Sequence, residues 1–207
     1  MGIDAVRMPM KNAELDALLN EVRRCQICAA DLPLGPRPVL RASPSSRILI
    51  VGQAPGTKVH ESGVPWNDAS GDRLRDWLEV ERDVFYDENQ IAIVLMGFCY
   101  PRRADNGGDK PPRPECAPLW HARLLDMLPR IELTLLVGGY AQRYYLQKSA
   151  EPTLTATVSK WQEYLPRLFP LPHPSWRSRG WASRNPWFEK DVVPDLRRLV
   201  EDILAPT

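Results

Sequence analysis

The sequence predicts an α/β fold, a three-layer α/β/α sandwich in which helices cover both faces of a central four-stranded parallel sheet. Three near-continuous apolar runs are typical of strands buried on both faces. They span residues 47–51, 91–96 and 131–137. Helical patterns lie between and after these runs, at about residues 70–80, 117–128 and 139–148. Because parallel neighbours need a crossover, usually a helix, this alternation favours parallel strands over hairpins.

Three further elements complete the predicted fold. At the N-terminus, residues 12–24 carry apolar side chains at helical spacing and begin with Asn12, a good N-cap residue. A short apolar run at 168–171 predicts the fourth strand, and a closing helix is expected near residues 187–204. The chain has no internal repeat and its apolar runs are evenly spread, so we expect one domain over residues 1–207.

The composition is that of a globular protein with proline-rich loops. Of 207 residues, 43% are hydrophobic, which is enough for a core and argues against a disordered chain. The 21 prolines exceed the usual share of roughly 5% about twofold and indicate ordered loops between short elements. With 27 Lys and Arg against 26 Asp and Glu, binding of nucleic acid requires a local basic patch.

The cysteine content and the apolar runs bear on where the protein works. No run approaches 18 consecutive apolar residues, so we expect no membrane span and no membrane partner. Four cysteines are too few for a disulfide-stapled secreted domain, and the first residues lack an apolar signal segment. We therefore expect a cytoplasmic protein, and we expect it to be a monomer.

The segments that follow the strands are the candidates for chemistry, because ligands bind beyond the carboxyl ends of an open parallel sheet. After the first strand comes Gly52-Gln-Ala-Pro-Gly56, whose two glycines allow the backbone to approach a ligand closely. Taken alone, this pentapeptide is a weak signal. The loop before the next helix holds Trp66, which fits either core packing or stacking on a flat ligand. It also holds Asp68, which fits either a helix cap or a role in the site.

The cysteines form one close pair, Cys25 and Cys28, and two distant single residues, Cys99 and Cys116. A CxxC pair with two further thiols can converge on one metal site, either zinc or an iron–sulfur cluster. Four ordinary buried thiols fit the same spacing. A redox pair is disfavoured, because the CxxC motif does not follow a strand in a βαβ unit.

The densest functional signal follows the last predicted strand, at residues 172–181. The wider segment from Lys160 to Lys190 has a basic excess and holds most of the chain's tryptophans. Basic residues interleaved with aromatic rings suit a nucleic-acid backbone and unstacked bases. The alternative is a proline-rich loop whose tryptophans, Trp187 above all, hold a C-terminal helix in place. A lone histidine is more often structural, but His173, held between two prolines at a strand end, is the candidate catalytic histidine.

Together these motifs resemble the uracil-DNA glycosylase superfamily. The resemblance rests on GQAPG after the first strand, on a Gly-x-Pro-aromatic loop before the next helix, and on HPS after the last strand. It runs from about Cys25 to Ser175, and the cysteine arrangement is similar to that of the iron–sulfur family-four members. It implies a four-stranded parallel sheet between helices and excision of uracil from DNA to leave an abasic site. It also implies a structural 4Fe-4S cluster bound by Cys25, Cys28, Cys99 and Cys116.

The resemblance also assigns the loop after the first strand. Gln53, with the backbone of Gly52 and Ala54 around it, falls where the family contacts uracil and orients the attacking water. Family-four members usually have Glu where this chain has Gln53, and family-one members have Asp where it has Ala54. The water-activating carboxylate of the family is therefore absent from this loop. The Asn that reads the uracil edge in the family corresponds to Leu95 or a neighbour.

For the base and its leaving group, the resemblance points to two rings. Trp66 falls where the family has a Phe that stacks on the flipped base, and His173 falls where a His donates to uracil O2. Asn67 is expected to replace the missing base-reading Asn, since its amide offers both a donor and an acceptor. The candidates for orienting or activating the water are Asp68, His60 and Gln53, the last by positioning only.

For the DNA backbone, Ser175 falls where the family touches a phosphate. We expect Arg177 and Arg179 to contact phosphates and Trp176 to wedge into the vacated base position, with uracil-containing DNA as the partner. One alternative keeps this fold with little turnover, as a protein that binds the lesion. An α/β nucleotide hydrolase is disfavoured, because no Walker-type lysine follows GQAPG and no carboxylate pair indicates a magnesium site.

Overall fold

The computed structural model describes residues 3–105, 107–176 and 178–205. At its centre are the parallel strands β1 (Ile48–Val51), β2 (Ile91–Ile93), β3 (Leu133–Val137) and β4 (Leu168–Leu171). Their order in the sheet is β2-β1-β3-β4, so β1 and β3 are the central strands. The predicted four-stranded parallel sheet is confirmed.

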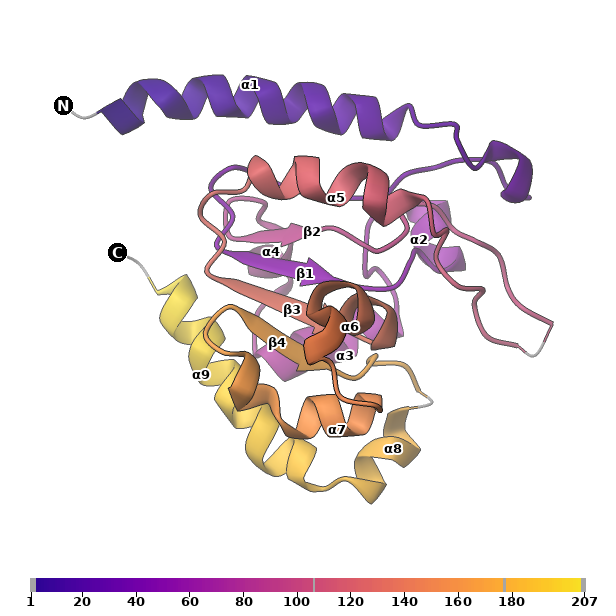
Figure 1. Ribbon diagram of the computed structural model, residues 1–207, viewed down its shortest axis with the longest axis vertical. Helices are drawn as coiled ribbons and strands as arrows, with labels where there is room; N and C mark the ends of the chain where they lie inside the picture. Colours follow the sequence, from indigo (N-terminus) through magenta and orange to yellow (C-terminus); the bar gives the residue numbers. More distant parts are fainter. Residues whose placement is uncertain (1–2, 106, 177, 206–207) are drawn as a thin grey trace.

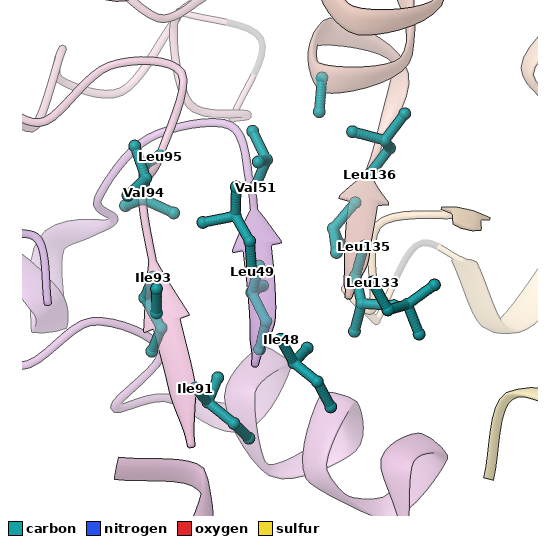
Figure 2. Packing of buried hydrophobic residues seen from close by; sticks show 14 of the residues in the cluster. Ile48, Leu49, Val51, Ile91, Ile93, Val94, Leu95, Leu133, Leu135 and Leu136 are labelled. Atoms are coloured by element: carbon teal, nitrogen blue, oxygen red, sulfur yellow. The ribbon is translucent and has the colours of Figure 1, made fainter. Parts of the chain in front are cut away.

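The strands are buried on both faces. Every residue of β1, β2 and β3 is buried, which explains why these strands appear in the sequence as unbroken apolar runs. Figure 2 shows their side chains packed in one apolar cluster. The prediction for β2 was too long, because this strand ends at Ile93. Residues 94–96 continue as a buried segment, where Met96 N–H donates to the Gly52 carbonyl at 2.8 Å.

Helices cover both faces of the sheet (Figure 1). Those on or near the sheet are α1 (Ile3–Arg23), α2 (Thr57–Ser62), α3 (Ala69–Leu78), α4 (Arg82–Tyr86), α5 (Cys116–Asp126) and α6 (Gly139–Leu146). The C-terminal part adds α7 (Leu154–Ser159), α8 (Ser178–Arg184) and α9 (Val193–Leu204). In Figure 1, α1 lies along the outside of α5, and α9 packs beside α3 with the sheet between the two pairs.

The helices predicted near 70–80, 117–128 and 139–148 are confirmed as α3, α5 and α6. The N-terminal helix begins at Ile3, so the prediction that Asn12 caps it is wrong, and Asn12 lies inside the helix. The closing helix is α9, preceded by a π-helical turn at Phe188–Val192. The short helices α2, α4, α7 and α8 were missed, because one or two turns leave too little periodicity to read. None of the described helices is long and apolar enough to cross a membrane.

Candidate active site

A cavity of about 360 Å³ opens beyond the carboxyl ends of the strands. Its wall is built from the loop after β1, the start of α3, the segments after β2 and the loop after β4. A cavity of this size can hold a small flat ligand. Several residues singled out in the sequence lie in this wall: Gln53, Ala54, Trp66, Asp68, His173, Ser175 and Trp176. The topology therefore brings together segments that are up to 123 residues apart by number.

Trp66 both packs in the core and forms part of the cavity wall. Its side chain is only 7% exposed, and its ring centroid lies 5.6 Å from that of His173, with 34° between the ring planes. Gly52 makes room for the indole, because a Cβ at this position would lie 2.6 Å from Trp66 Cζ2. Gly52 therefore acts through Trp66 and is not itself in the cavity wall.

His173 follows β4 directly and lies between Pro172 and Pro174. Gly138 at the end of β3 has φ +89°, and a Cβ there would lie 3.6 Å from His173 Cβ, so the two loops meet closely. Burial lowers the pKa of the His173 imidazole, and the negative charge of Asp68 works against that shift. The ring is therefore neutral at pH 7 and has one N–H to donate.

Asp68 fulfils both roles that the sequence left open. It caps α3, with Gly71 N–H donating to Asp68 Oδ1 at 2.9 Å, and it lies in the cavity wall. Its other oxygen faces the loop after β1. A methyl group added at Gly56 would lie 3.8 Å from Asp68 Oδ2 and 3.8 Å from Asp109 Oδ2.

Gln53 holds a hairpin-like loop against the site. Its Nε2 donates to the main-chain carbonyl of Lys110 at 3.2 Å, across 57 positions of sequence. In this loop, Arg103 and Asp109 form an antiparallel bridge, and Lys110 N–H donates to the Arg102 carbonyl at 2.9 Å. Arg103 and Asp109 thereby join the cavity wall. We did not predict either residue, because a polar glycine-rich loop gives no sequence signal of where it folds.

His60 and Asn67, like Gly52, were predicted for the site but do not line the cavity. His60 lies in α2 with its ring 5.9 Å from the Tyr100 ring, centroid to centroid. Asn67 is adjacent to Trp66 in sequence, but its Oδ1 accepts a hydrogen bond from Arg82 Nη2 at 2.8 Å. Their placement gives no support to the roles expected of them in water activation and base reading.

Leu95 lies in the cavity wall, at the place where the resemblance expects an Asn. The cavity therefore has an apolar surface where an amide was expected. The Leu95 carbonyl points away to His121, whose Nε2 lies 3.0 Å from it, while His121 Nδ1 lies 2.7 Å from the Tyr145 hydroxyl. Burial lowers the pKa of His121 to about 4, so this ring is also neutral.

The rim of the cavity carries Ser175 and Trp176. The Trp176 side chain is 73% exposed at this rim. Arg179 is exposed in α8, close along the chain but outside the cavity wall. Arg177 lies outside the described residues.

The four cysteines line a second cavity, separate from the first, between the end of α1, the segment after β2 and the start of α5. All four are free thiols, and apolar side chains such as Phe98 and Trp120 share the lining. Phe98 N–H donates to the sulfur of Cys116 at 3.4 Å. Burial raises the pKa of Cys99 to about 11 and that of Cys116 to about 12.

Within the described parts of the chain, no group of three or more His, Cys, Asp or Glu side chains is arranged to hold a metal ion. The donor chemistry of the second cavity fits a larger group bound by thiolates. Four sulfurs share one cavity, its lining is largely apolar, and backbone N–H groups of Phe98 and Arg37 donate to the sulfurs of Cys116 and Cys99. Such hydrogen bonds to sulfur are typical of iron–sulfur sites.

Comparison with known proteins gives two similarities. The family model described as Uracil DNA glycosylase superfamily matches residues 41–197. A protein of Sulfurisphaera tokodaii named Type-4 uracil-DNA glycosylase is 25% identical over 174 residues, which cover 79% of this chain and 73% of the relative. The match to the family model includes the whole first cavity, from Gln53 to Trp176.

Proposed function

The chain belongs to the uracil-DNA glycosylase superfamily, and on that premise we propose that it excises uracil from DNA. The reaction is hydrolysis of the N-glycosidic bond, which leaves an abasic site. The observation that carries the proposal is the pair of Trp66 and His173, which face one cavity at the carboxyl ends of the strands. One ring can stack on a base while the other donates a hydrogen bond to it.

The target base must leave the DNA stack before it can enter the cavity, at a cost of a few kcal/mol. Stacking on Trp66 offsets that cost by roughly 1–3 kcal/mol. Trp176 is suited to fill the space that the base vacates, since it is a large exposed ring at the rim of the cavity. Ser175 and Arg179 are proposed to contact phosphates, together with Arg177.

Cleavage of the bond between C1′ and N1 leaves negative charge on the uracil ring and positive charge on the sugar. The main catalytic need is therefore a donor aimed at uracil O2, in the manner of an oxyanion hole. His173 fits this role because its lowered pKa keeps it a neutral donor. A neutral donor stabilises the developing charge without transferring its proton to the leaving group.

We further propose that Cys25, Cys28, Cys99 and Cys116 hold a 4Fe-4S cluster. When bound, such a cluster would cross-link the segment after α1 to the start of α5. Its proposed role is structural, and it takes no part in the proposed hydrolysis. The test is protein purified without oxygen. A broad absorption band near about 400 nm, typical of thiolate-bound iron, is expected. A colourless protein free of iron would contradict this assignment.

The proposed activity is tested with an oligonucleotide that contains a single uracil. After incubation with the protein, hot alkali cleaves the strand at abasic sites, and gel electrophoresis separates the product. We expect a cleaved strand with uracil and none with thymine at the same position. Tight binding of the uracil strand without cleavage would instead support the alternative, a lesion-binding protein of the same fold, which the absence of a carboxylate at Gln53 and Ala54 favours.

A further inference from the structure

The helix α2 and the loop that follows it form part of the first cavity. Val59 of α2 lies in the cavity wall, and the loop ends at Trp66. The end of the loop near Trp66 is held by Tyr86, whose hydroxyl donates to the Pro65 carbonyl at 2.9 Å. The other end begins at α2, which has only six residues. Since so short a helix is not stable by itself, the position of the loop depends on the contacts that hold α2.

Arg37 holds the C-terminal end of α2. Its Nη1 donates to the main-chain carbonyl of His60 at 2.5 Å and to that of Glu61 at 3.0 Å. Both carbonyls lie in the last turn, where a helix leaves carbonyls without partners and favours a cation. The guanidinium lies against Gly63, the residue that ends α2, because a Cβ there would be 2.9 Å from Arg37 Nη2. The side chain therefore reaches the turn from which the chain continues to Trp66.

The main chain around Arg37 lies against the second cavity, which the four cysteines line. The prolines on either side of Arg37 belong to the lining of that cavity. The Arg37 backbone N–H donates to the sulfur of Cys99, and Val39 N–H donates to the Phe98 carbonyl at 2.8 Å. The proline after Arg37 also restricts its backbone to extended conformations. One residue thus contacts the cysteine site with its main chain and α2 with its side chain.

A second contact joins the N-terminal end of α2 to the same cysteine. Thr57, the first residue of α2, donates from Oγ1 to the Tyr100 hydroxyl at 3.0 Å. Tyr100 directly follows Cys99 and is buried. Both ends of α2 are therefore held by residues that contact Cys99 or are adjacent to it.

We infer that Arg37 is a positioning residue that couples the cysteine site to the loop carrying Trp66. When the four thiolates are held together, Cys99 and the segment of Arg37 keep one arrangement, and the guanidinium holds the end of α2. When the thiolates are released, α2 and the loop lose this support. A base binds only to the molecules whose loop is in place, so weaker support raises the apparent Kd. This effect on base binding rests on the proposed glycosylase function, whereas the coupling itself does not.

The test compares Arg37→Ala with Arg197→Ala. Each change removes a guanidinium that donates to a main-chain carbonyl in the last turn of a helix. Arg197 donates to Asp76 of α3 at 2.8 Å and lies outside the lining of both cavities. Because Arg37→Ala keeps the backbone N–H that donates to Cys99, we expect its iron content to match the wild type. Hydrogen exchange over residues 57–66 is measured by mass spectrometry, first with iron bound. Iron is then removed with ferricyanide and EDTA, and the freed thiols are reduced again.

With iron bound, we expect Arg37→Ala to raise the exchange rate over residues 57–66 by about tenfold and Arg197→Ala to match the wild type. Removal of iron should raise the same rate by about tenfold in the wild type. In Arg37→Ala it should add less than about threefold, because only the contact of Tyr100 then remains to transmit the change. If Arg37 served local stability alone, the two effects would multiply.

DNA binding gives a second readout. The Kd is measured for a 2′-fluorinated uracil strand that resists cleavage and for a matched thymine strand. We expect Arg37→Ala to raise the first Kd by about tenfold and the second by less than about twofold. The single-turnover rate at saturating enzyme should fall by less than about threefold, since bound molecules have the loop in place. A protein that is merely destabilised would lose affinity for both strands.

The outcomes separate this inference from the proposed function. Protein purified without oxygen that contains no iron refutes the cluster and this coupling together. If iron removal leaves the exchange over residues 57–66 unchanged in the wild type, or raises it equally in Arg37→Ala, the inference alone is refuted. If Arg37→Ala does not fold, Tyr100→Phe takes its place, and the same response to iron removal as in the wild type refutes the coupling. The expected exchange pattern in a protein that releases no uracil refutes only the proposed function.

Discussion

The side-chain amide of Gln53 donates to the main-chain carbonyl of Lys110, with 3.2 Å between Nε2 and O. This bond joins the loop after β1 to the hairpin-like loop after β2, and both loops form the wall of the same cavity. An ionised glutamate at this position could not make it, because a carboxylate has no hydrogen to donate. Where family-four members usually have Glu, this chain has a Gln whose side chain holds the loop after β2 in position.

The first prediction concerns Gln53→Glu, which restores the residue usual in family-four members. If Gln53 positions the loop, the new carboxylate repels the Lys110 carbonyl and displaces Asp109. We expect the single-turnover rate to fall roughly 10- to 100-fold. Gln53→Ala, which also removes the bond, is the comparison and should lose activity as well. A Glu variant that is faster than the wild type would show that this position had only lacked its carboxylate.

The second prediction concerns His173→Ala. Removal of the donor to uracil O2 is expected to lower the single-turnover rate by about a hundredfold or more. Binding of an uncleavable uracil strand should be affected much less, since Trp66 still stacks on the base. A rate near that of the wild type would remove His173 from the proposed mechanism.

The third prediction is a loss of stability in mild acid that depends on His121. Burial lowers the pKa of this ring to about 4, so the folded protein binds fewer protons there than the unfolded chain between pH 6.5 and about 4. Stability therefore falls as the pH drops through this window, by up to about 3 kcal/mol from His121. The lowered pKa of His173 acts in the same direction.

The matching experiment is urea unfolding at several pH values for the wild type and for His121→Gln. Glutamine keeps polar atoms near the Leu95 carbonyl and the Tyr145 hydroxyl but does not titrate. The variant should be less stable at pH 7 and should lose less stability than the wild type on acidification. Parallel curves for the two proteins would show that His121 is not buried in its neutral form.

The fourth prediction concerns the salt dependence of DNA binding. If Arg177 and Arg179 contact phosphates, replacing both with Ala makes the negative slope of the logarithm of the DNA-binding constant against the logarithm of the salt concentration shallower by about two. Arg198→Ala is the control, because Arg198 lies on α9 and pairs with Asp195 and Asp202. A slope that the double change leaves untouched would place the DNA on another face of the protein.

Much of the fold was predictable, because strands that are buried on both faces consist of unbroken runs of apolar residues. β1 and β3 were predicted from such runs, whereas α3, α5 and α6 were predicted from helical patterns. The end of β2 was not predicted correctly, because residues 94–96 are as apolar as those of a strand but lie outside β2. The sequence likewise could not show that Asn12 lies within α1, because a residue that can cap a helix is also tolerated inside one.

The residues of the candidate site also differ in how far the sequence could predict them. His173, which follows β4 directly, was predictable as a candidate for the site, because ligands bind beyond the carboxyl ends of parallel strands. The place of Trp66 in the cavity wall was predicted only through the family resemblance. His60 and Asn67 were expected beside them and are absent from the cavity wall, since a neighbour in sequence can point to the other side of its loop. Asp109 lies in the cavity wall but was not predicted, because it is distant in sequence from the other residues of the site. The loop that carries it is held by contacts that include the hydrogen bond from Gln53 to the neighbouring Lys110, across 57 positions, and contacts between loops distant in sequence arise only when the chain has folded.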